Sequence, residues 1–438
     1  MNGLFVKFHL VLLINWSRNS SSITRTVSML AAAWIAAAAV SCAFAQDTEL
    51  LLVQMIYRHG ARAPIIPYPT DPNPPESWPE GFGTLTKLGK RQHYVLGTFL
   101  RSFYSGFVTS DPKELMVNST EYDRCIRSAL SNLASFYAPT EEWTIEEGLA
   151  WQPIAVYYKD SASDRYLAMG SKCPKFFEIQ DQRFNSTEFM NVVESHREMI
   201  EAVMYHGGVP DWQWACLLQD TVLAEKVHGL IVPEWLDPWW EELTELTEFA
   251  FFWLFNTPQQ KRIRAGPILG KFIENMDNKI AGINDQIKVH MYSAHDANLV
   301  ALLEALDLYE RRPPFSACLL VELHELLDGE KAIRLLYLNS STPEDINTIH
   351  PNILKLQGCG EFCPLEDFRQ LTKHLIPEDW DKECQTTNEL YNNEAESLSR
   401  LFGSHEFMDN KMPTTTGGTT CGPSTGSNEM IDCSVDTE

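Results

Sequence analysis

The chain has 438 residues, of which 44% are hydrophobic and 21% are charged, and its formal net charge at pH 7 is −24. A chain of this length has enough residues for one large domain or several ordinary ones, each with a substantial core. The negative charge argues against nucleic acid and anionic membranes as partners, although a cleft that concentrates positive groups can still bind an anion.

The first 45 residues have the features of a secretory signal peptide. Residues 30–40 are apolar but too few to span a bilayer, and Ala43-Phe44-Ala45 is a small-residue cleavage site. The segment holds three basic residues and no acidic one, so its removal would change the formal charge from −24 to −27. An uncleaved signal anchor is the alternative. We expect a mature protein that is secreted or lysosomal and has no membrane span.

A buried strand is predicted over residues 50–57, directly before the motif RHGARAP at residues 58–64. The imidazole of His59 would therefore emerge at the carboxyl end of a strand, where open α/β sheets bind ligands. Arg58 and Arg62 supply planar, permanently charged groups that match phosphate oxygens, and a neutral histidine is a nitrogen nucleophile. A surface basic cluster with an unrelated histidine is the alternative. The strand and the second arginine favour a phosphate site that contains a nucleophile.

The following segments predict a mixed succession of helices and strands. A Pro-rich loop near the site, an amphipathic helix, a short strand and a helix capped by Ser119 or Thr120 are expected over residues 68–79, 86–104, 114–117 and 121–136. Residues 143–265 are rich in aromatic and acidic side chains at helical spacing, which indicates a helical cap inserted into the sheet domain. Their aromatic side chains are interpreted as core rather than as a cofactor site.

The last third of the chain returns to strands. Residues 286–293 predict a strand, and Ala294-His295-Asp296 begins a helix that ends near residue 306. An aspartate at a helix N-terminus that faces a cleft can protonate a leaving oxygen, although the helix dipole favours its ionised form. On these residues alone, His295 and Asp296 are equally well explained as a helix cap. Two further strands at 318–324 and 332–338 predict an antiparallel hairpin.

Cysteine and asparagine patterns fit a secreted protein. Ten cysteines become nine when Cys42 leaves with the signal peptide, and the absence of recurring C-x-x-C pairs with histidine partners disfavours zinc. Cys359 and Cys363 are close enough for a local disulfide, whereas spacing alone cannot pair the other cysteines. Acceptor sequences for N-glycosylation begin at Asn118, Asn185 and Asn339.

From about residue 49 to residue 388 the sequence resembles the histidine acid phosphatase family, in particular its prostatic and lysosomal branch. The matching segments occur in the order YRHGARAP, GFGTLTKLGKRQHYVLGTFLR, STEYDRCIRSALSNLASF, WQPIAV, MYSAHDANLVALLEALDLY, GCGEFCPLEDF and ECQTTN. The resemblance implies an α/β sheet domain with flanking helices, similar to phosphoglycerate mutase, plus an inserted, mainly helical cap domain. The expected boundaries are a signal peptide at 1–45, a catalytic domain at 46–142 and 266–400, a cap at 143–265 and a flexible Thr/Gly/Ser-rich tail at 401–438.

The resemblance also implies roles for the motif residues. His59 would be the nucleophile that forms a phosphohistidine, Arg58, Arg62 and His295 would hold the phosphoryl oxygens, and Asp296 would protonate the leaving group. No metal and no other cofactor would be needed.

The same resemblance suggests three disulfides. The implied pairs are Cys173 with Cys384, Cys216 with Cys318, and Cys359 with Cys363. Cys125 would remain a buried helix thiol, and Cys421 and Cys433 in the tail would pair with each other or with a second chain.

One position departs from the family pattern R-S-T-x-x-D-R. This chain has Asn118 in place of the first arginine, which we interpret as the loss of a phosphate ligand. Losing one donor to the transition state typically costs on the order of 10²–10³ in rate, so we expect weakened catalysis. Arg124 and Arg127 lie further along the next helix and are expected to point elsewhere. A glycan on Asn118 is not expected inside a phosphate pocket.

The leading hypothesis is therefore an acid phosphatase that hydrolyses small phosphomonoesters or phosphoproteins. The alternative is a catalytically dead, phosphatase-like secreted binding protein. A mutase-type transferase is disfavoured by the signal peptide and the cysteines, and phytase-like action is disfavoured because it requires a strongly basic pocket. Resemblance to the family makes a homodimer plausible, and composition does not bear on it.

Overall fold

The structure is a computed structural model that describes residues 48–169, 171–389 and 391. The predicted signal peptide and the predicted tail with Cys421 and Cys433 lie outside the described residues. An eight-stranded mixed sheet forms the centre of the fold, with the strand order β3-β2-β4-β1-β5-β6-β7 and with β8 paired to β6. The strands are β1 (Thr48–Arg58), β2 (Leu115–Thr120), β3 (Val156–Lys159), β4 (Val289–Ala294), β5 (Cys318–Leu326), β6 (Lys331–Leu338), β7 (Asn352–Leu354) and β8 (Cys363–Pro364).

The two halves of the sheet differ in strand direction. Strands β3, β2, β4 and β1 are parallel, whereas β5, β6 and β7 are antiparallel to their neighbours. The predicted hairpin is confirmed, because β5 pairs with β6 from Cys318↔Leu338 to Glu325↔Lys331. Gly329, with φ of 86°, occupies the turn in the left-handed region that favours glycine.

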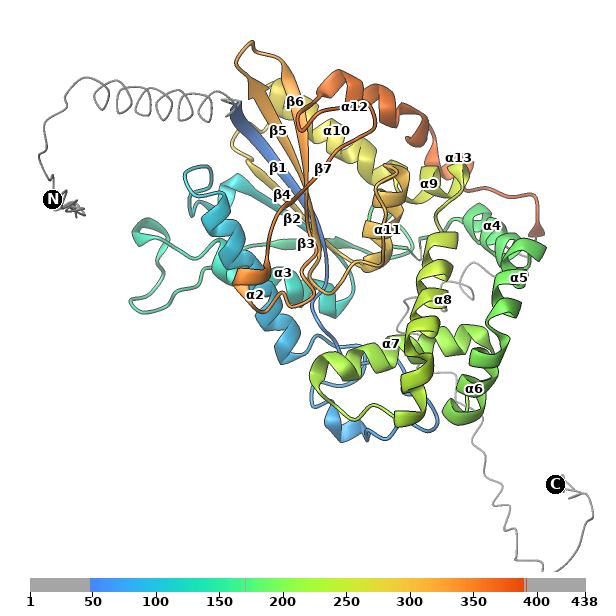
Figure 1. Ribbon diagram of the computed structural model, residues 1–438. Coiled ribbons are helices and arrows are strands. Elements are labelled where there is room, and N and C mark those ends of the chain that lie inside the picture. The colour runs from blue at the N-terminus through green and yellow to red at the C-terminus, as the bar shows by residue number, and fades with distance from the viewer. Residues whose placement is uncertain (1–47, 170, 390, 392–438) are drawn as a thin grey trace, which may run out of the picture.

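Helices cover both faces of the sheet (Figure 1). Helices α2 (Lys87–Phe103) and α3 (Asp123–Phe136) cover one face, and α10 (Gly266–Ile280), α11 (Asp296–Ala305) and α12 (Leu365–Thr372) lie on the other. Alternate residues of β1 serve the two faces: Val53, Met55 and Tyr57 pack with α2 and α3, whereas Leu52 and Ile56 belong to the opposite core. This burial on both faces explains why β1 is a nearly continuous apolar run.

A group of helices lies beside the sheet in Figure 1. It comprises α4 (Pro174–Phe184), α5 (Thr187–Ser195), α6 (Arg197–Gly207), α7 (Trp212–His228), α8 (Trp240–Trp253) and α9 (Pro258–Arg264), and the short α13 (Trp380–Glu383) follows much later in the chain. Aromatic side chains such as Phe189 and Trp253 are buried in this group. Its core is continuous with the core on the α10 face of the sheet.

Two local predictions differ from the structure. Ser119 and Thr120 do not cap a helix, because β2 continues through both residues and pairs them with Tyr158 and Lys159 of β3. Helix α3 begins only at Asp123. Strand β3 itself was missed within a segment predicted to be helical, since it is a four-residue, largely exposed edge strand.

The disulfide pairs are partly as expected. Cys173 is bonded to Cys384, and Cys359 is bonded to Cys363. The expected pair Cys216–Cys318 is not found, because both residues are buried free thiols that belong to different hydrophobic cores. Cys125 is a buried free thiol in α3, as expected.

A search of the described residues for membrane-spanning segments gave no helix with the length and apolar character that crossing a bilayer requires.

Candidate active site

A hydrogen-bonded loop after β1 fixes the position of His59. The backbone N–H of Gly60 donates to Oγ of Ser128 in α3 at 3.1 Å. On the other side the loop touches α2 so closely that a Cβ on Gly60 would lie 2.4 Å from the carbonyl oxygen of Gly89. The nucleophile candidate is therefore held between two helices by a contact that only glycine permits.

The hydrogen bond of the His59 ring defines which nitrogen is available for reaction. Nδ1 lies 2.8 Å from the carbonyl oxygen of Gly60. A carbonyl only accepts, so Nδ1 carries the proton and Nε2 keeps its lone pair. This tautomer is the one required if Nε2 attacks phosphorus.

Burial and nearby positive charge keep the His59 imidazole neutral. Its exposed fraction is 2%. Burial first, and then the charges of Arg124, His295 and Arg58, hold the pKa of His59 well below its ordinary value of 6.5. The ring therefore remains a neutral nucleophile in mildly acidic solution.

The end of β4 brings the second predicted pair to the same place. The backbone N–H of His59 donates to the carbonyl oxygen of Ala294, and the rings of His59 and His295 lie 5.5 Å apart, edge to face. Nε2 of His295 is 3.2 Å from the hydroxyl of Thr120 at the end of β2. Burial and then Arg124 also lower the pKa of His295. Three neighbouring strand ends thus converge, as the sequence predicted for two of them.

Asp296, the first residue of α11, is held between two guanidiniums. Its Oδ2 lies 3.2 Å from Nη2 of Arg58, and 2.8 Å and 2.7 Å from Nε and Nη2 of Arg312. Burial alone would raise the pKa of Asp296, but Arg58, Arg312 and His59 outweigh it and hold this pKa well below the usual range. In the unliganded site this carboxyl group is ionised.

A second buried carboxylate links the arginines on the far side. Asp220 of α7 accepts from Nη2 of Arg62 at 2.7 Å and from Nη2 of Arg312 at 3.0 Å. Burial would raise the pKa of Asp220, but Arg62 and Arg312 lower it. Helix α7 thereby contributes to a site whose other groups come from the sheet domain.

Arg124, which we expected to point elsewhere, lies at this site. Among charged groups, Arg124 has the largest effect on the pKa values of His59 and His295. Its side chain is buried, and its guanidinium lies over the Tyr122 ring, 4.6 Å from the ring centroid. The reason is local: β2 continues to Thr120, so Arg124 falls in the first turn of α3, immediately behind the strand end. Burial lowers the pKa of this guanidinium.

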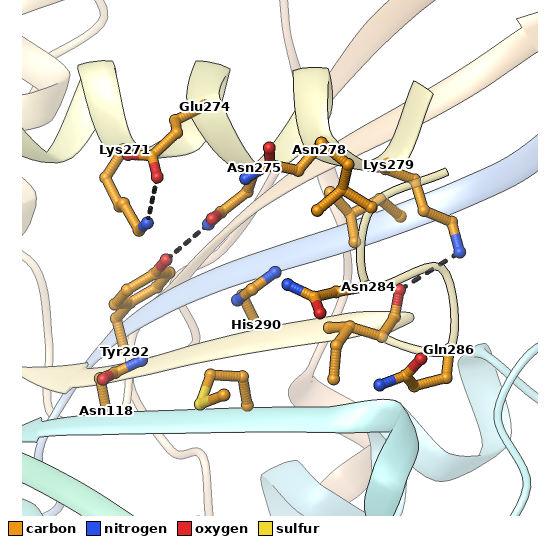
Figure 2. Close-up of a pocket in the computed structure, with 14 residues that line it drawn as sticks. Asn118, Lys271, Glu274, Asn275, Asn278, Lys279, Asn284, Gln286, His290 and Tyr292 are labelled. Atoms are coloured by element: carbon orange, nitrogen blue, oxygen red, sulfur yellow. Dashed lines mark hydrogen bonds and ion pairs between the residues drawn. The ribbon is translucent and has the colours of Figure 1, made fainter. Parts of the chain in front are cut away.

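Asn118, in contrast, faces a different cavity. This cavity of about 450 Å³ lies between α10 and strands β2 and β4, and Figure 2 shows Asn118 there with Lys271, His290 and Tyr292. The residues that line it include none of Arg58, His59, Arg62, His295 and Asp296. Asn118 thus lines a cavity apart from these five residues, and the expectation that it weakens catalysis stays a prediction.

Sequence reasoning missed three members of the site. Arg124 could have been found by extending β2 to the end of its run of strand-forming residues, and Arg312 stands out only as part of Arg311-Arg312-Pro313-Pro314. Asp220 lies in a helix far along the chain and carries no local signal.

The assembled site contains a surplus of positive charge, with four guanidiniums and two carboxylates. They are Arg58, Arg62, Arg124 and Arg312, with Asp220 and Asp296.

Comparisons with known proteins match most of the chain. A family model described as "Histidine phosphatase superfamily (branch 2)" matches residues 49–338. Lysosomal acid phosphatase of Rattus norvegicus is 34% identical over 373 residues, which cover 83% of this chain and 86% of that protein. Prostatic acid phosphatase of Homo sapiens is 34% identical over 352 residues, which cover 78% and 89% of the two chains.

Solved structures with the same fold include bacterial phytases. Hafnia alvei phytase in complex with myo-inositol hexakis sulphate has a TM-score of 0.60 at 17% identity and covers 78% of this chain and all 100% of its own. Citrobacter braakii phytase has a TM-score of 0.57 at 18% identity, with 77% and 100% covered. At these identities the likeness shows the fold alone.

Proposed function

Because the chain belongs to the histidine phosphatase superfamily, branch 2, we propose that it is an acid phosphatase that hydrolyses phosphate monoesters through a phosphohistidine on His59. The observation that carries the proposal is the neutral, Nδ1-protonated imidazole of His59 within a buried surplus of guanidiniums. The names of the lysosomal and prostatic relatives support the same reaction.

The first chemical step forms a nitrogen–phosphorus bond. Nε2 of His59 attacks the phosphorus with its lone pair while Arg58 and Arg62 neutralise the phosphoryl oxygens. The ester P–O bond breaks, and Asp296 gives a proton to the departing oxygen, which leaves as an alcohol. His295 contributes a further contact to the phosphoryl group.

The second step returns the enzyme to its starting state. A water molecule attacks the phosphohistidine, the N–P bond breaks, and inorganic phosphate leaves. Asp296 accepts a proton from that water, so one ester and one water become one alcohol and one phosphate. No metal or organic cofactor takes part in the proposed steps.

We include Arg124 among the phosphoryl ligands in this proposal. Its charge acts on both imidazoles, and its Nε is buried and has no hydrogen-bond partner among the described residues. A guanidinium in this position supplies the charge that we had expected Asn118 to have removed. The proposal therefore replaces the expectation of weakened turnover.

Trapping the phosphoenzyme tests the nucleophile and the turnover together. Wild-type protein mixed with an aryl phosphate and quenched in denaturant is expected to gain one phosphoryl mass on a peptide that contains His59. His59→Ala is expected to lose both the mass and the hydrolysis, whereas His350→Ala, an exposed histidine, keeps both. Turnover by His59→Ala at the wild-type rate would contradict the proposal.

The compartment and the modifications follow from the same assignment. We propose a secreted or lysosomal protein, in line with the names of its relatives. Among the acceptor asparagines Asn185 is exposed, whereas Asn118 and Asn339 are half-buried, so Asn185 is the strongest candidate for a glycan. Formation of a homodimer stays a prediction.

A further inference from the structure

Arg312 occupies a position that the reaction described above does not use. It lies after α11, beside Pro313, whose carbonyl oxygen accepts a hydrogen bond from Nη1 of Arg58 at 2.7 Å. Two nitrogens of Arg312 contact one carboxylate oxygen of Asp296, the group assigned to protonate the leaving oxygen. A guanidinium in this contact opposes the protonation that the carboxyl group needs in order to act as an acid.

Arg312 is also anchored by two further contacts, to Asp220 and to the Phe251 ring, although its Nη1 has no hydrogen-bond partner among the described residues. Its Nη2 also contacts Asp220 at 3.0 Å, and its guanidinium carbon lies 4.4 Å above the Phe251 ring of α8. Only 9% of the side chain is exposed. Arg58 is also held, by Pro313 and by the Phe315 ring at 4.2 Å, but it touches Asp296 through a single nitrogen at 3.2 Å and belongs to the motif that flanks the nucleophile.

The different contacts with Asp296 suggest different roles for Arg312 and Arg58. A bound phosphoryl group shares the charge of Arg58 and adds negative charge beside the carboxylate, and both changes favour protonation of Asp296. Arg312 remains in place because Asp220 and Phe251 hold it. We propose that Arg312 is a positioning residue that keeps Asp296 ionised and oriented until phosphate is bound, and thereby sets the pH above which leaving groups that need a proton are no longer released.

The proposal rests on the proposed function, in which Asp296 gives its proton to the leaving oxygen as the ester P–O bond breaks and then returns to the carboxylate. The proton reaches Asp296 from solvent or from the monoanionic phosphate of the substrate. Other titratable or charged groups also act on Asp296 and remain unchanged in the test. They are Arg58 at the end of β1, His59 directly after it, Arg124 and Cys125 in α3, His295 beside Asp296, and Tyr309 after α11.

The test compares two substrates over a range of pH. An alkyl phosphate such as glycerol 2-phosphate has a poor leaving group that requires a proton, whereas 4-nitrophenyl phosphate has an activated one. In Arg312→Gln, the alkaline limb of kcat for the alkyl phosphate is expected to move up by about 1 pH unit or more, because removing an adjacent opposite charge shifts a carboxyl group by about 1–3 units. The limb for the aryl phosphate is expected to stay in place.

Two matched variants separate charge from structure. Arg312→Lys keeps the positive charge and is expected to keep the limb of the alkyl phosphate within about 0.3 unit of wild type, a small part of the 1–3 units expected for full charge removal. Arg311→Gln removes a neighbouring exposed arginine and is expected to leave the pH dependence of kcat unchanged for both substrates. Equal loss on both substrates in Arg312→Gln, with no displacement of the limb, would overturn the proposal and leave Arg312 a structural residue. If Arg312→Gln does not fold, Arg312→Lys still tests the proposal. A shift of about 1 pH unit in its alkaline limb of kcat for the alkyl phosphate would overturn the proposal, because the positive charge is retained.

Asp296→Asn distinguishes failure of this inference from failure of the proposed function. If Asp296 is the acid, this variant loses far more turnover with the alkyl phosphate than with the aryl phosphate. Equal losses on both substrates refute the role of Asp296 itself, and with it the inference. A selective loss in Asp296→Asn without a shifted limb in Arg312→Gln refutes the inference alone.

Discussion

Two clusters of polar side chains border the parallel half of the sheet, the α10 cavity and the strand-end site, and they differ in how their charges are balanced. In the cavity under α10, each lysine has a carboxylate partner: Lys271 lies 2.9 Å from Glu274, and Lys279 lies 3.0 Å from Asp285. At the strand ends, the guanidiniums of Arg58, Arg62 and Arg312 share two carboxylates, and the buried Arg124 adds a fourth positive charge. A polar lining alone therefore does not identify an anion site, whereas a buried surplus of one charge does.

Each cluster also contains a histidine, the half-buried His290 or the buried His59, and the causes of their low pKa values differ. Burial first, with a smaller contribution from Lys271, lowers the pKa of His290 to about 4. For His59, burial is followed by the charges of three arginines and of His295. The first histidine is neutral mainly because it is desolvated, and the second is also surrounded by positive charge that a phosphate would compensate.

The largest expected effect comes from reducing the charge surplus at the strand ends. Arg124→Ala is expected to lower kcat/KM for an aryl phosphate by about 10²–10³, as is typical when one donor to transition-state charge is removed. Steady-state kinetics at mildly acidic pH measure this. Arg127→Ala is the matched control, because Arg127 lies on the same helix, is about half exposed and pairs with Asp123.

The outcome of that pair decides whether Arg124 belongs to the site. If Arg124→Ala and Arg127→Ala both remain within about threefold of wild type, well short of the usual loss for a transition-state donor, Arg124 does not contact the phosphoryl group. The surplus of positive charge at the strand-end site would then consist of three guanidiniums instead of four.

Binding of inorganic phosphate gives the next largest effect. Phosphate at about 100 times its Kd is expected to stabilise the wild-type fold by about 2.7 kcal/mol, because it binds only the native state. Thermal unfolding with and without phosphate measures the effect as a rise in Tm. Lys271→Ala in the α10 cavity is expected to keep the rise, and Arg124→Ala to lose most of it. Loss of the rise in Lys271→Ala instead would place the anion site under α10.

Much of the fold was predictable because its main elements have strong local patterns. The apolar run of β1 and the strands of the β5–β6 hairpin were placed close to their observed bounds. Edge strand β3 was missed because three of its four residues are exposed, so it has no apolar pattern. The start of α3 was misplaced because Ser119 and Thr120 are typical helix caps, whereas pairing with β3 and β4 extends β2 through them.

The site was predictable where its residues follow strands, and not elsewhere. His59 and Asp296 come directly after β1 and β4, and adjacent parallel strands bring their carboxyl ends together. Asp220 and Arg312 reach the site through the packing of α7 and of the segment after α11, which no local pattern encodes. Arg124 was expected to point elsewhere, and the true end of β2 at Thr120, three residues beyond the predicted end, brings it to the site in the first turn of α3.

Arg124→Ala is expected to have a smaller effect on the titration of His59 and none on that of His290. Because positive charge lowers the pKa of His59, Arg124→Ala should raise it, and the imidazole should then take up a proton at a higher pH than in wild type. The pKa of His290 should not change. NMR titration of ¹⁵N-histidine-labelled protein measures both, with His59→Ala and His290→Ala to assign the signals. A shift of both histidines by the same amount would indicate a general structural change instead.

The smallest expected effect comes from Asn118→Arg, which restores the arginine of the family pattern. Its side chain would enter the α10 cavity, where the neighbouring charged groups Lys271 and Lys279 are already paired. Without an anion there to bind, the new charge should leave kcat/KM within about twofold of wild type, far from the effect of a donor to transition-state charge. A gain on the order of 10²-fold, the usual value of one transition-state donor, would mean that an arginine at 118 does reach the phosphoryl group. In that case the α10 cavity and the strand-end site would act as one site, and Arg124 would not be the only replacement for the arginine of the family pattern.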